Sequence, residues 1–297
     1  MDHSTLALLE RIFATVFPLV AIVTVGFLYA RKKHTDMSAA NALNIDVFVP
    51  ALLFSVLSAK SFDLMRFQEL AIGGIIVVIG SGLIIWPVCK LLKVNPKTFL
   101  PPIMFNNSGN LGLPLAVLAF GEEALAAAVV LFLVENTLHF TVGLYILDKK
   151  TNPFQVLRMP IILASILGLT WSGFHLPLPT PIATFIDMLG KISIPLMLFA
   201  LGVRMTSVDL THWKLGVWGA ILCPLSGLLI AVPLQSVLHL EPIQFAYLLL
   251  FAALPPAVLN YMLAERYQQE PHQVASIVLL GNISSLLFIP ATLYFIL

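Results

Sequence analysis

Residues 106–114 read Asn-Asn-Ser-Gly-Asn-Leu-Gly-Leu-Pro, in the middle of an apolar run that extends from about residue 99 to residue 120. Asparagine and glycine are poor helix formers, and Pro114 has no N–H to donate to the carbonyl four residues back. A second interruption, at residues 254–260, reads Leu-Pro-Pro-Ala-Val-Leu-Asn within a later apolar run. Each stretch therefore predicts a helix that is broken near its middle.

The composition places these helices in a membrane. Of the 297 residues, 59% are hydrophobic and only 10% are charged, and the mean hydropathy is +0.96, whereas a soluble domain carries roughly a quarter charged residues. We therefore predict an all-α polytopic membrane protein of the cell (inner) membrane, with the lipid bilayer as its surroundings. A net charge of +1 gives no basic field for nucleic acid.

Ten apolar runs are long enough to cross the bilayer, which takes about 20 residues each. They lie near residues 11–30, 40–59, 69–90, 99–120, 123–147, 157–174, 182–204, 214–237, 243–264 and 272–297. With this count, twelve basic residues flank one side of the membrane and three flank the other. Because basic loops stay in the cytoplasm, we predict that both termini are extracytoplasmic.

The chain divides into two halves of five predicted helices, residues 1–147 and 157–297, joined by a short cytoplasmic linker at 148–156. An odd number of helices in each half means that the second half inserts upside down. Residues 50–54 (PALLF) are echoed by residues 195–199 (PLMLF), and Asn136 is echoed by Asn282. Inverted repeats with broken helices in corresponding positions are typical of secondary transporters.

The two breaks predict the substrate site. Unwound backbone at this depth must be buried in protein or line a wet cavity, and two half-helix N-termini aimed at one place favour an anion. The predicted substrate-binding residues are Asn107, Gly109, Asn110, Gly112, Pro114, Pro255, Pro256 and Asn260. In this prediction the asparagine amides and freed N–H groups bind the anion, the prolines hold the breaks open, and no arginine lies nearby.

Three intramembrane charges are candidates for ion coupling, because such residues are costly in lipid. Asp46 and Lys191 each lie four residues before a proline of the repeat, so they predict a pair across the pseudo-twofold axis, with Asp187 as the alternative partner for Lys191. Glu135, in the middle of the fifth predicted helix, is the best candidate to carry a coupling proton or cation. His139, one turn later, either shares that proton or packs.

Residues 107–115 and 254–267 resemble the auxin efflux carrier family, which includes plant auxin carriers and bacterial malate and malonate carriers, and the resemblance covers nearly the whole chain. It implies a ten-helix crossover fold related to bile acid symporters and sodium/proton antiporters. Helices 1, 2, 6 and 7 would form a scaffold, with homodimerisation through it left open, and helices 3–5 and 8–10 a moving transport domain. Substrate would bind beside the crossing of helices 4 and 9, near Asn107, Pro114 and Pro255.

Together these features predict a secondary active transporter of small organic anions that works by an elevator-type movement, with a proton or sodium as the coupling ion. The alternatives are an anion-conducting channel and a sodium-coupled organic anion symporter of the bile acid type. The sequence lacks the signatures of ATP hydrolysis and of intramembrane proteolysis, so we expect neither an enzyme nor a bound cofactor or metal.

Overall fold

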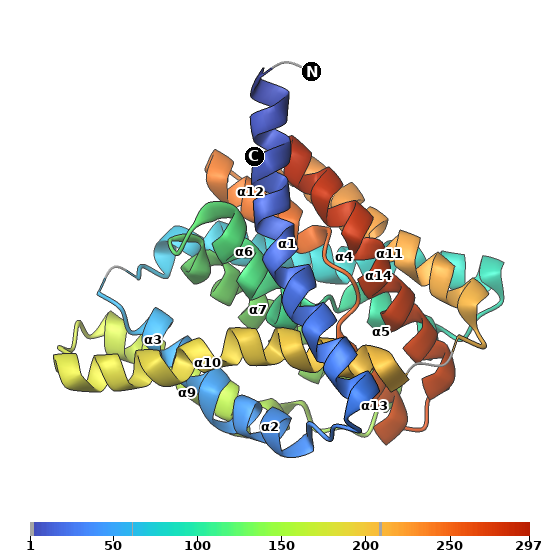
Figure 1. Cartoon of the computed structure of the whole chain (residues 1–297), viewed down its shortest axis with the longest axis horizontal. Coiled ribbons are helices and arrows are strands. Elements are labelled where there is room, and N and C mark those ends of the chain that lie inside the picture. Colours follow the sequence, from blue (N-terminus) through green and yellow to red (C-terminus); the bar gives the residue numbers. More distant parts are fainter. Residues whose placement is uncertain (1–2, 61, 208–209) are drawn as a thin grey trace.

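The chain is folded almost entirely into helices in the computed structural model, which describes residues 3–60, 62–207 and 210–297 (Figure 1). The first half contains α1 (His3–Lys32), α2 (Ser38–Leu43), η1 (Asn44–Phe48), α3 (Val49–Leu57), η2 (Met65–Phe67), α4 (Gln68–Leu92), α5 (Pro96–Met104), η3 (Ser108–Gly112), α6 (Leu113–Phe120), α7 (Ala124–Leu138), η4 (His139–Gly143) and α8 (Leu144–Leu147). The second half contains η5 (Pro153–Arg158), α9 (Pro160–Gly173), α10 (Thr180–Arg204), η6 (Met205–Ser207), α11 (Trp213–Leu234), α12 (Pro242–Ala252), α13 (Val258–Arg266) and α14 (Pro271–Ile296).

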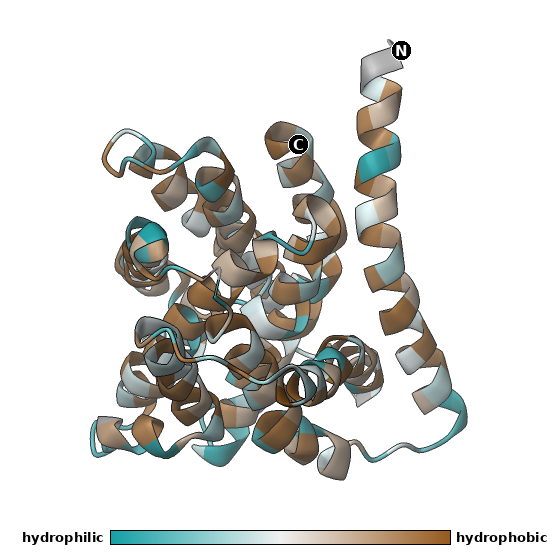
Figure 2. Ribbon diagram, turned by 90° about the vertical axis from the view of Figure 1, so that its left-hand side faces the viewer, coloured by the Kyte–Doolittle hydropathy of each residue, from teal (hydrophilic) through white to brown (hydrophobic). Residues whose placement is uncertain are grey.

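Seven helical segments of the described chain are long and apolar enough to cross a membrane. They are residues 5–32, 38–57, 65–92, 124–147, 180–204, 213–234 and 271–296. The other three predicted spans are shorter. Two are broken, at residues 105–107 and 253–257, and α9 has 14 residues, or about 21 Å of helix. Figure 2 shows hydrophobic residues along the helices and hydrophilic residues gathered in the loops at the two ends.

Packing divides the helices into two groups. The first group is α1, α3, α9 and α10, in which α10 packs along both α1 and α3. The second group contains α4 to α8 and α11 to α14, with α11 packed along α14 and α4. The groups touch where α1 meets α6 and α14, and where α10 meets η3. The division into a scaffold and a transport domain, and the movement of one past the other, stay predictions.

The beginning of α1 and the end of α14 lie at the same end of the molecule, and α2 and α13 lie at the opposite end (Figures 1 and 2). The loop after α1 leads directly into α2, so it lies at the end that carries α2 and α13. This loop and the last turn of α1 contain Arg31, Lys32 and Lys33, three of the twelve basic residues on the predicted cytoplasmic side.

The first group is held together by a close crossing of α1 and α10. A methyl group on Gly202 of α10 would lie 2.0 Å from the carbonyl oxygen of Val23, and one on Gly26 of α1 would lie 2.2 Å from that of Phe199. Because both obstacles are backbone atoms, neither can move aside as a side chain does. Close contact through small residues is how helices associate in lipid, where no hydrophobic force draws them together.

We predict that Gly202→Ala lowers the free energy of unfolding by about 1–3 kcal/mol, the usual range for overpacking, and lowers the melting temperature by several degrees. Gly173→Ala is the matched control, because a methyl group there meets nothing within 4 Å. Thermal unfolding of the purified proteins measures both. Equal melting temperatures for the two variants would show that the α1–α10 crossing is looser than described.

Candidate functional site

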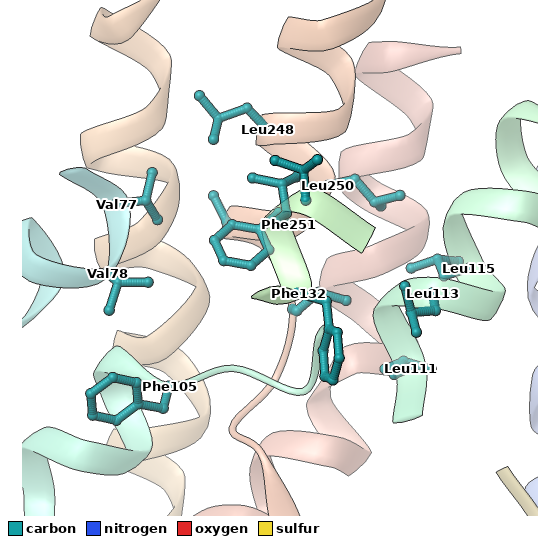
Figure 3. Packing of buried hydrophobic residues seen from close by; sticks show 14 of the residues in the cluster. Val77, Val78, Phe105, Leu111, Leu113, Leu115, Phe132, Leu248, Leu250 and Phe251 are labelled. Atoms are coloured by element: carbon teal, nitrogen blue, oxygen red, sulfur yellow. The ribbon is translucent and has the colours of Figure 1, made fainter. Parts of the chain in front are cut away.

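The two broken helices cross each other through their extended segments. The Asn107 N–H donates to the Pro255 carbonyl at 2.7 Å, and the Ala257 N–H donates to the Phe105 carbonyl at 3.0 Å, which forms an antiparallel bridge between Asn106 and Pro256. Figure 3 shows the chain leaving α5 at Phe105 and passing the extended segment below Phe251. Each break thus supplies backbone partners for the other, as the lipid interior requires.

Asparagine side chains complete this crossover from both directions. The Asn106 amide donates to the Phe251 carbonyl at the end of α12, at 2.7 Å. The Asn260 amide, from the first turn of α13, donates to the Phe105 carbonyl at the end of α5, at 2.9 Å. Each asparagine therefore donates a hydrogen bond to a C-terminal carbonyl of the other broken helix. Such a carbonyl has no N–H donor inside its own helix.

Asn107 occupies a different position from the one predicted. Its amide nitrogen donates to the side-chain oxygen of Asn282 at 3.1 Å, and the Asn282 amide in turn donates to the Pro256 carbonyl at 3.0 Å. We predicted that this amide binds substrate; α14 places an acceptor beside one of its two N–H groups, and the binding role stays a prediction. The sequence noted Asn282 only as a repeat partner.

Pro114 does not hold the first break open, which corrects the prediction. It is buried in the first turn of α6, while the extended break lies earlier, at residues 105–107. Gly112 instead permits close packing of the two breaks, because a methyl group there would lie 2.8 Å from the Leu254 side chain. Pro255 and Pro256 lie in the second break, where they were predicted.

A cavity of about 180 Å³ lies beside the crossover, between the two groups of helices. The second group lines it with Asn106, Asn107, Gly109, Asn110, Phe132, Glu135, Asn136, His139, Phe140, Ala257, Val258, Leu259 and Met262. The first group, together with α2 and η1 that precede α3, lines it with Asn41, Asn44, Ile45, Val49, Met159, Ile161, Met197, Ala200, Leu201 and Arg204. The predicted residues Asn107, Gly109 and Asn110 are therefore brought to one cavity, whereas Gly112, Pro114, Pro255, Pro256 and Asn260 lie in the structure around it.

Three π-helical turns, η1, η3 and η4, contribute residues to this cavity. A π-turn is rare and appears mostly at functional sites, because its wider hydrogen-bond ring costs stability. In η3, the Gly112 N–H donates to the Asn107 carbonyl five residues back, at 3.0 Å. The sequence pattern did not predict these turns, since the residues that form them also occur in α-helices.

Buried polar atoms without a hydrogen-bond partner are concentrated around the cavity. Among the described residues that line it, these atoms are Asn44 Oδ1, Asn106 Oδ1, Glu135 Oε1, Asn136 Nδ2, and both ring nitrogens of His139. Buried polar groups in proteins are nearly always paired, so each exception needs a reason. Six such atoms around one cavity indicate a site that binds a polar ligand.

Glu135 forms the acidic part of the cavity. Its Oε2 accepts a hydrogen bond from Ser108 Oγ at 2.9 Å, and its Oε1 lies 3.3 Å from His139 Nδ1, close enough for an ion pair although not in hydrogen-bond geometry. The His139 ring stacks on Phe105 with 4.2 Å between centroids and 7° between planes. His139 therefore both packs and approaches the carboxylate, the two alternatives that the sequence left open.

Arg204 is the cationic side chain of this cavity, and the sequence analysis did not predict it. It is the last residue of α10 and interacts with neighbouring groups. We expected no arginine near the substrate because Arg204 was counted with the cytoplasmic charges. The sequence could place it at the end of the span, but only the packing of α10 against η3 directs that end toward the crossover.

The predicted Asp46–Lys191 pair is wrong. Lys191 Nζ pairs with Asp187 Oδ2 at 2.6 Å, one turn earlier on α10, which is the alternative partner. Asp46 is exposed on η1, and neither Asp46 nor Lys191 is among the described residues that line the cavity. The π-turn of η1 has no counterpart in α10, so equal distances from a proline do not give equal side-chain directions.

Comparison with known proteins identifies the family to which the chain belongs. The profile described as membrane transport protein matches residues 11–158 and 149–294, and so covers most of the chain. The protein belongs to the auxin efflux carrier family of membrane transporters. The resemblance seen in residues 107–115 and 254–267 is thereby confirmed.

Several relatives within this family match the protein over most of their length. A protein of Rhizobium meliloti named "Putative malonate transporter" is 23% identical, with 97% of each chain covered. An uncharacterized transporter of Methanothermobacter thermautotrophicus is 27% identical over 93% of this chain and 95% of its own. An uncharacterized transporter of Escherichia coli K12 is 23% identical over 85% and 87%. This auxin efflux carrier family member is therefore a multi-pass membrane transporter.

We predict that Asn282→Ala destabilises the protein by about 1–3 kcal/mol, because it leaves the buried Asn107 amide and Pro256 carbonyl without their partner. Asn110→Ala is the control, since Asn110 lines the same cavity and has no side-chain hydrogen bond among the described residues. Thermal unfolding should show a lower melting temperature for Asn282→Ala only. A similar decrease in both variants would contradict the bracing role of Asn282.

Proposed function

We propose that the protein is a secondary transporter of small organic anions, with carboxylates as the substrate class and the cavity beside the crossover as the binding site. The observation that carries this proposal is the convergence of Arg204 and two helix N-termini on one cavity that also contains unpartnered amide groups.

The N-termini belong to the helices that follow the two breaks. η3 and α6 form one helical segment that begins at Ser108, and α13 begins at Val258; both beginnings line or adjoin the cavity. The first N–H groups of a helix have no acceptor in their own helix and carry a partial positive charge. Arg204 adds a full charge from the other group of helices, so the cavity offers two kinds of anion binding.

The size and the walls of the cavity support a small substrate. Its volume of about 180 Å³ is below the roughly 300–1,000 Å³ of pockets that hold drug-sized ligands. The wall from the second group is rich in amides, while Val49, Met197 and Leu201 make the facing wall largely apolar. A short carboxylate with an aliphatic body fits this division, and the relative named for malonate supports the same class.

The position of the cavity supports alternating access. The cavity lies between the two groups of helices and is lined by Asn41 of α2, Met159 just before α9, and Arg204 at the end of α10. The basic loop after α1 leads into α2, and we assign this end of the molecule to the cytoplasm by the distribution of charge. We therefore propose ten spans in two inverted halves, an inward-facing state, and movement of the second group past the first.

An anion channel would use a similar polar constriction but would conduct without saturation and without exchange. A sodium-coupled symporter would saturate, but its uptake would depend on a sodium gradient. Counterflow in proteoliposomes separates these possibilities, because only a carrier exchanges internal for external substrate. A panel of mono- and dicarboxylates that includes malonate identifies the class.

We predict saturable counterflow of a short carboxylate, and a binding constant that weakens by about ten- to a hundredfold in Arg204→Gln. This range follows from the roughly 1.5–3 kcal/mol of a charge-assisted hydrogen bond. Arg204→Lys should retain part of the affinity. Arg66→Gln is the control, since Arg66 pairs with Glu241 at 3.2 Å on an exposed surface. Linear flux without counterflow would contradict the carrier, and wild-type affinity in Arg204→Gln would contradict the site.

We predict that residue 150, in the linker between the two halves, is cytoplasmic. Both native cysteines, Cys89 and Cys223, are buried, so a cysteine introduced at Lys150 can be labelled over a low background. An impermeant thiol reagent should react with it only after the membrane is opened, while a cysteine at Phe174, exposed after α9, should react in intact cells. The reverse pattern would invert the topology.

A further inference from the structure

Glu135 and His139 face each other with one polar atom apiece that has no hydrogen-bond partner. Glu135 Oε1 and His139 Nδ1 are 3.3 Å apart, and both side chains are at least 96% buried. A single proton placed between these two atoms gives each of them a partner. We propose that Glu135 and His139 form a proton-binding site, and that the bound proton is carried together with the anion; this second part rests on the proposed function.

The atoms around the site favour a proton over a metal cation. Hard cations are bound by several oxygen ligands, whereas Glu135 is surrounded by one hydroxyl, Ser108 Oγ, and by the imidazole of His139. The next unpartnered atom is the amide nitrogen of Asn136, assigned as a donor rather than a ligand. The site therefore offers few oxygens to a sodium ion but a base and an acid for a proton.

Charge links this proton to an anion in the same cavity. A deprotonated Glu135 beside a neutral His139 leaves a buried negative charge, which the low dielectric penalises and which repels a carboxylate ligand. With one more proton the pair is neutral overall and no longer opposes the attraction of the helix N-termini and of Arg204 for the anion. The proton and the anion therefore favour each other's binding, which is the requirement for symport.

His139 also lines a second, smaller cavity of about 10 Å³, together with Lys97, Thr98, Asn260 and Leu263. Lys97 is exposed and donates to the Leu147 carbonyl at 2.9 Å, so this cavity lies between His139 and the basic face. Imidazole has two nitrogens and can pass a proton from one to the other.

Packing fixes the His139 ring in this position. Its stacking on Phe105 ties the ring to the first break, and a methyl group on Gly143 would lie 2.8 Å from the Phe105 ring and 3.0 Å from His139. Ser108, which bonds Glu135, is the first residue after the same break. The proton site is thus attached to the crossover at two points.

Few other titratable groups surround the pair. Among the described residues that line the cavities on either side, they are Arg204 in the central cavity, Lys97 in the smaller one, and Tyr247 in a third cavity beyond Ser108. Single variants of Glu135 and His139 therefore distinguish a proton bound by the pair from protons bound by these other groups.

The first experiment detects the proton without any substrate. Infrared difference spectra of the purified protein between acidic and alkaline pH should contain the band of a protonated buried carboxyl group. The band should be absent in Glu135→Gln, shifted in His139→Gln, and unchanged in Glu123→Gln, an exposed glutamate in the turn before α7. A spectrum without such a band, or a band that persists in Glu135→Gln, overturns the proton site.

The second experiment tests coupling with malonate as the probe. Wild-type binding should weaken by about tenfold for each pH unit once the pair has lost its proton, and an inward proton gradient should drive uptake into proteoliposomes. Binding by Glu135→Gln should no longer depend on pH, and the Glu123→Gln control should follow the wild type. Uptake driven by a sodium gradient instead, or pH-dependent binding in Glu135→Gln, overturns the coupling.

The outcomes of the two experiments distinguish a failure of the proton site from a failure of the proposed function. If the wild type shows the Glu135 band but no counterflow of any carboxylate, the proposed substrate class is wrong and the proton site stands. If counterflow is present and independent of pH, the transporter stands and the coupled proton is wrong. Melting temperatures of all variants confirm that each compared protein is folded.

Discussion

The architecture depends on satisfying the backbone of two interrupted helices inside a membrane protein. A break in a helix leaves N–H and C=O groups without their helical hydrogen bonds, and lipid has no groups that could replace these bonds. Here the two breaks lie against each other, so the Asn107 N–H and the Phe105 carbonyl find partners in the opposite break. The side-chain amides of Asn106, Asn260 and Asn282 donate further hydrogen bonds to backbone carbonyls at the breaks. Neither broken helix could be placed at this depth alone.

The same arrangement explains why the polar site lies beside the crossover. Two helices that end and two that begin in the protein interior bring helix termini, and therefore partial charges, to a place without bulk water. The glycines there let neighbouring backbones approach closely, and the π-turns change the direction of side chains within a few residues. Both lower the stability of the helices, a cost that a purely structural contact does not require. The apolar packing of Figure 3, with Phe105, Phe132 and Phe251 around the breaks, stabilises this region.

Charges within the protein follow two different patterns. Asp187 and Lys191 neutralise each other along the outer face of α10, which lets a helix carry both at little net cost. Glu135, His139 and Arg204 instead face the cavity from both groups of helices. An ion pair within one helix does not constrain how that helix packs against others. The interaction between charges on two groups of helices changes with the relative position of those groups and with a ligand between them.

The sequence by itself determined the membrane class, the family, the approximate helix boundaries and the two breaks, because hydropathy, glycine and proline act locally along the chain. It could not determine that Asn282 occupies the Asn107 amide, that Arg204 lines the cavity, or that Lys191 pairs with Asp187. Asp46 shows the reason: a single π-turn in η1 changes the direction of a side chain without leaving a mark in the sequence. Side-chain partners depend on helix rotation and, for Asn107 and Asn282, on residues 175 positions apart, so only the tertiary structure decided them.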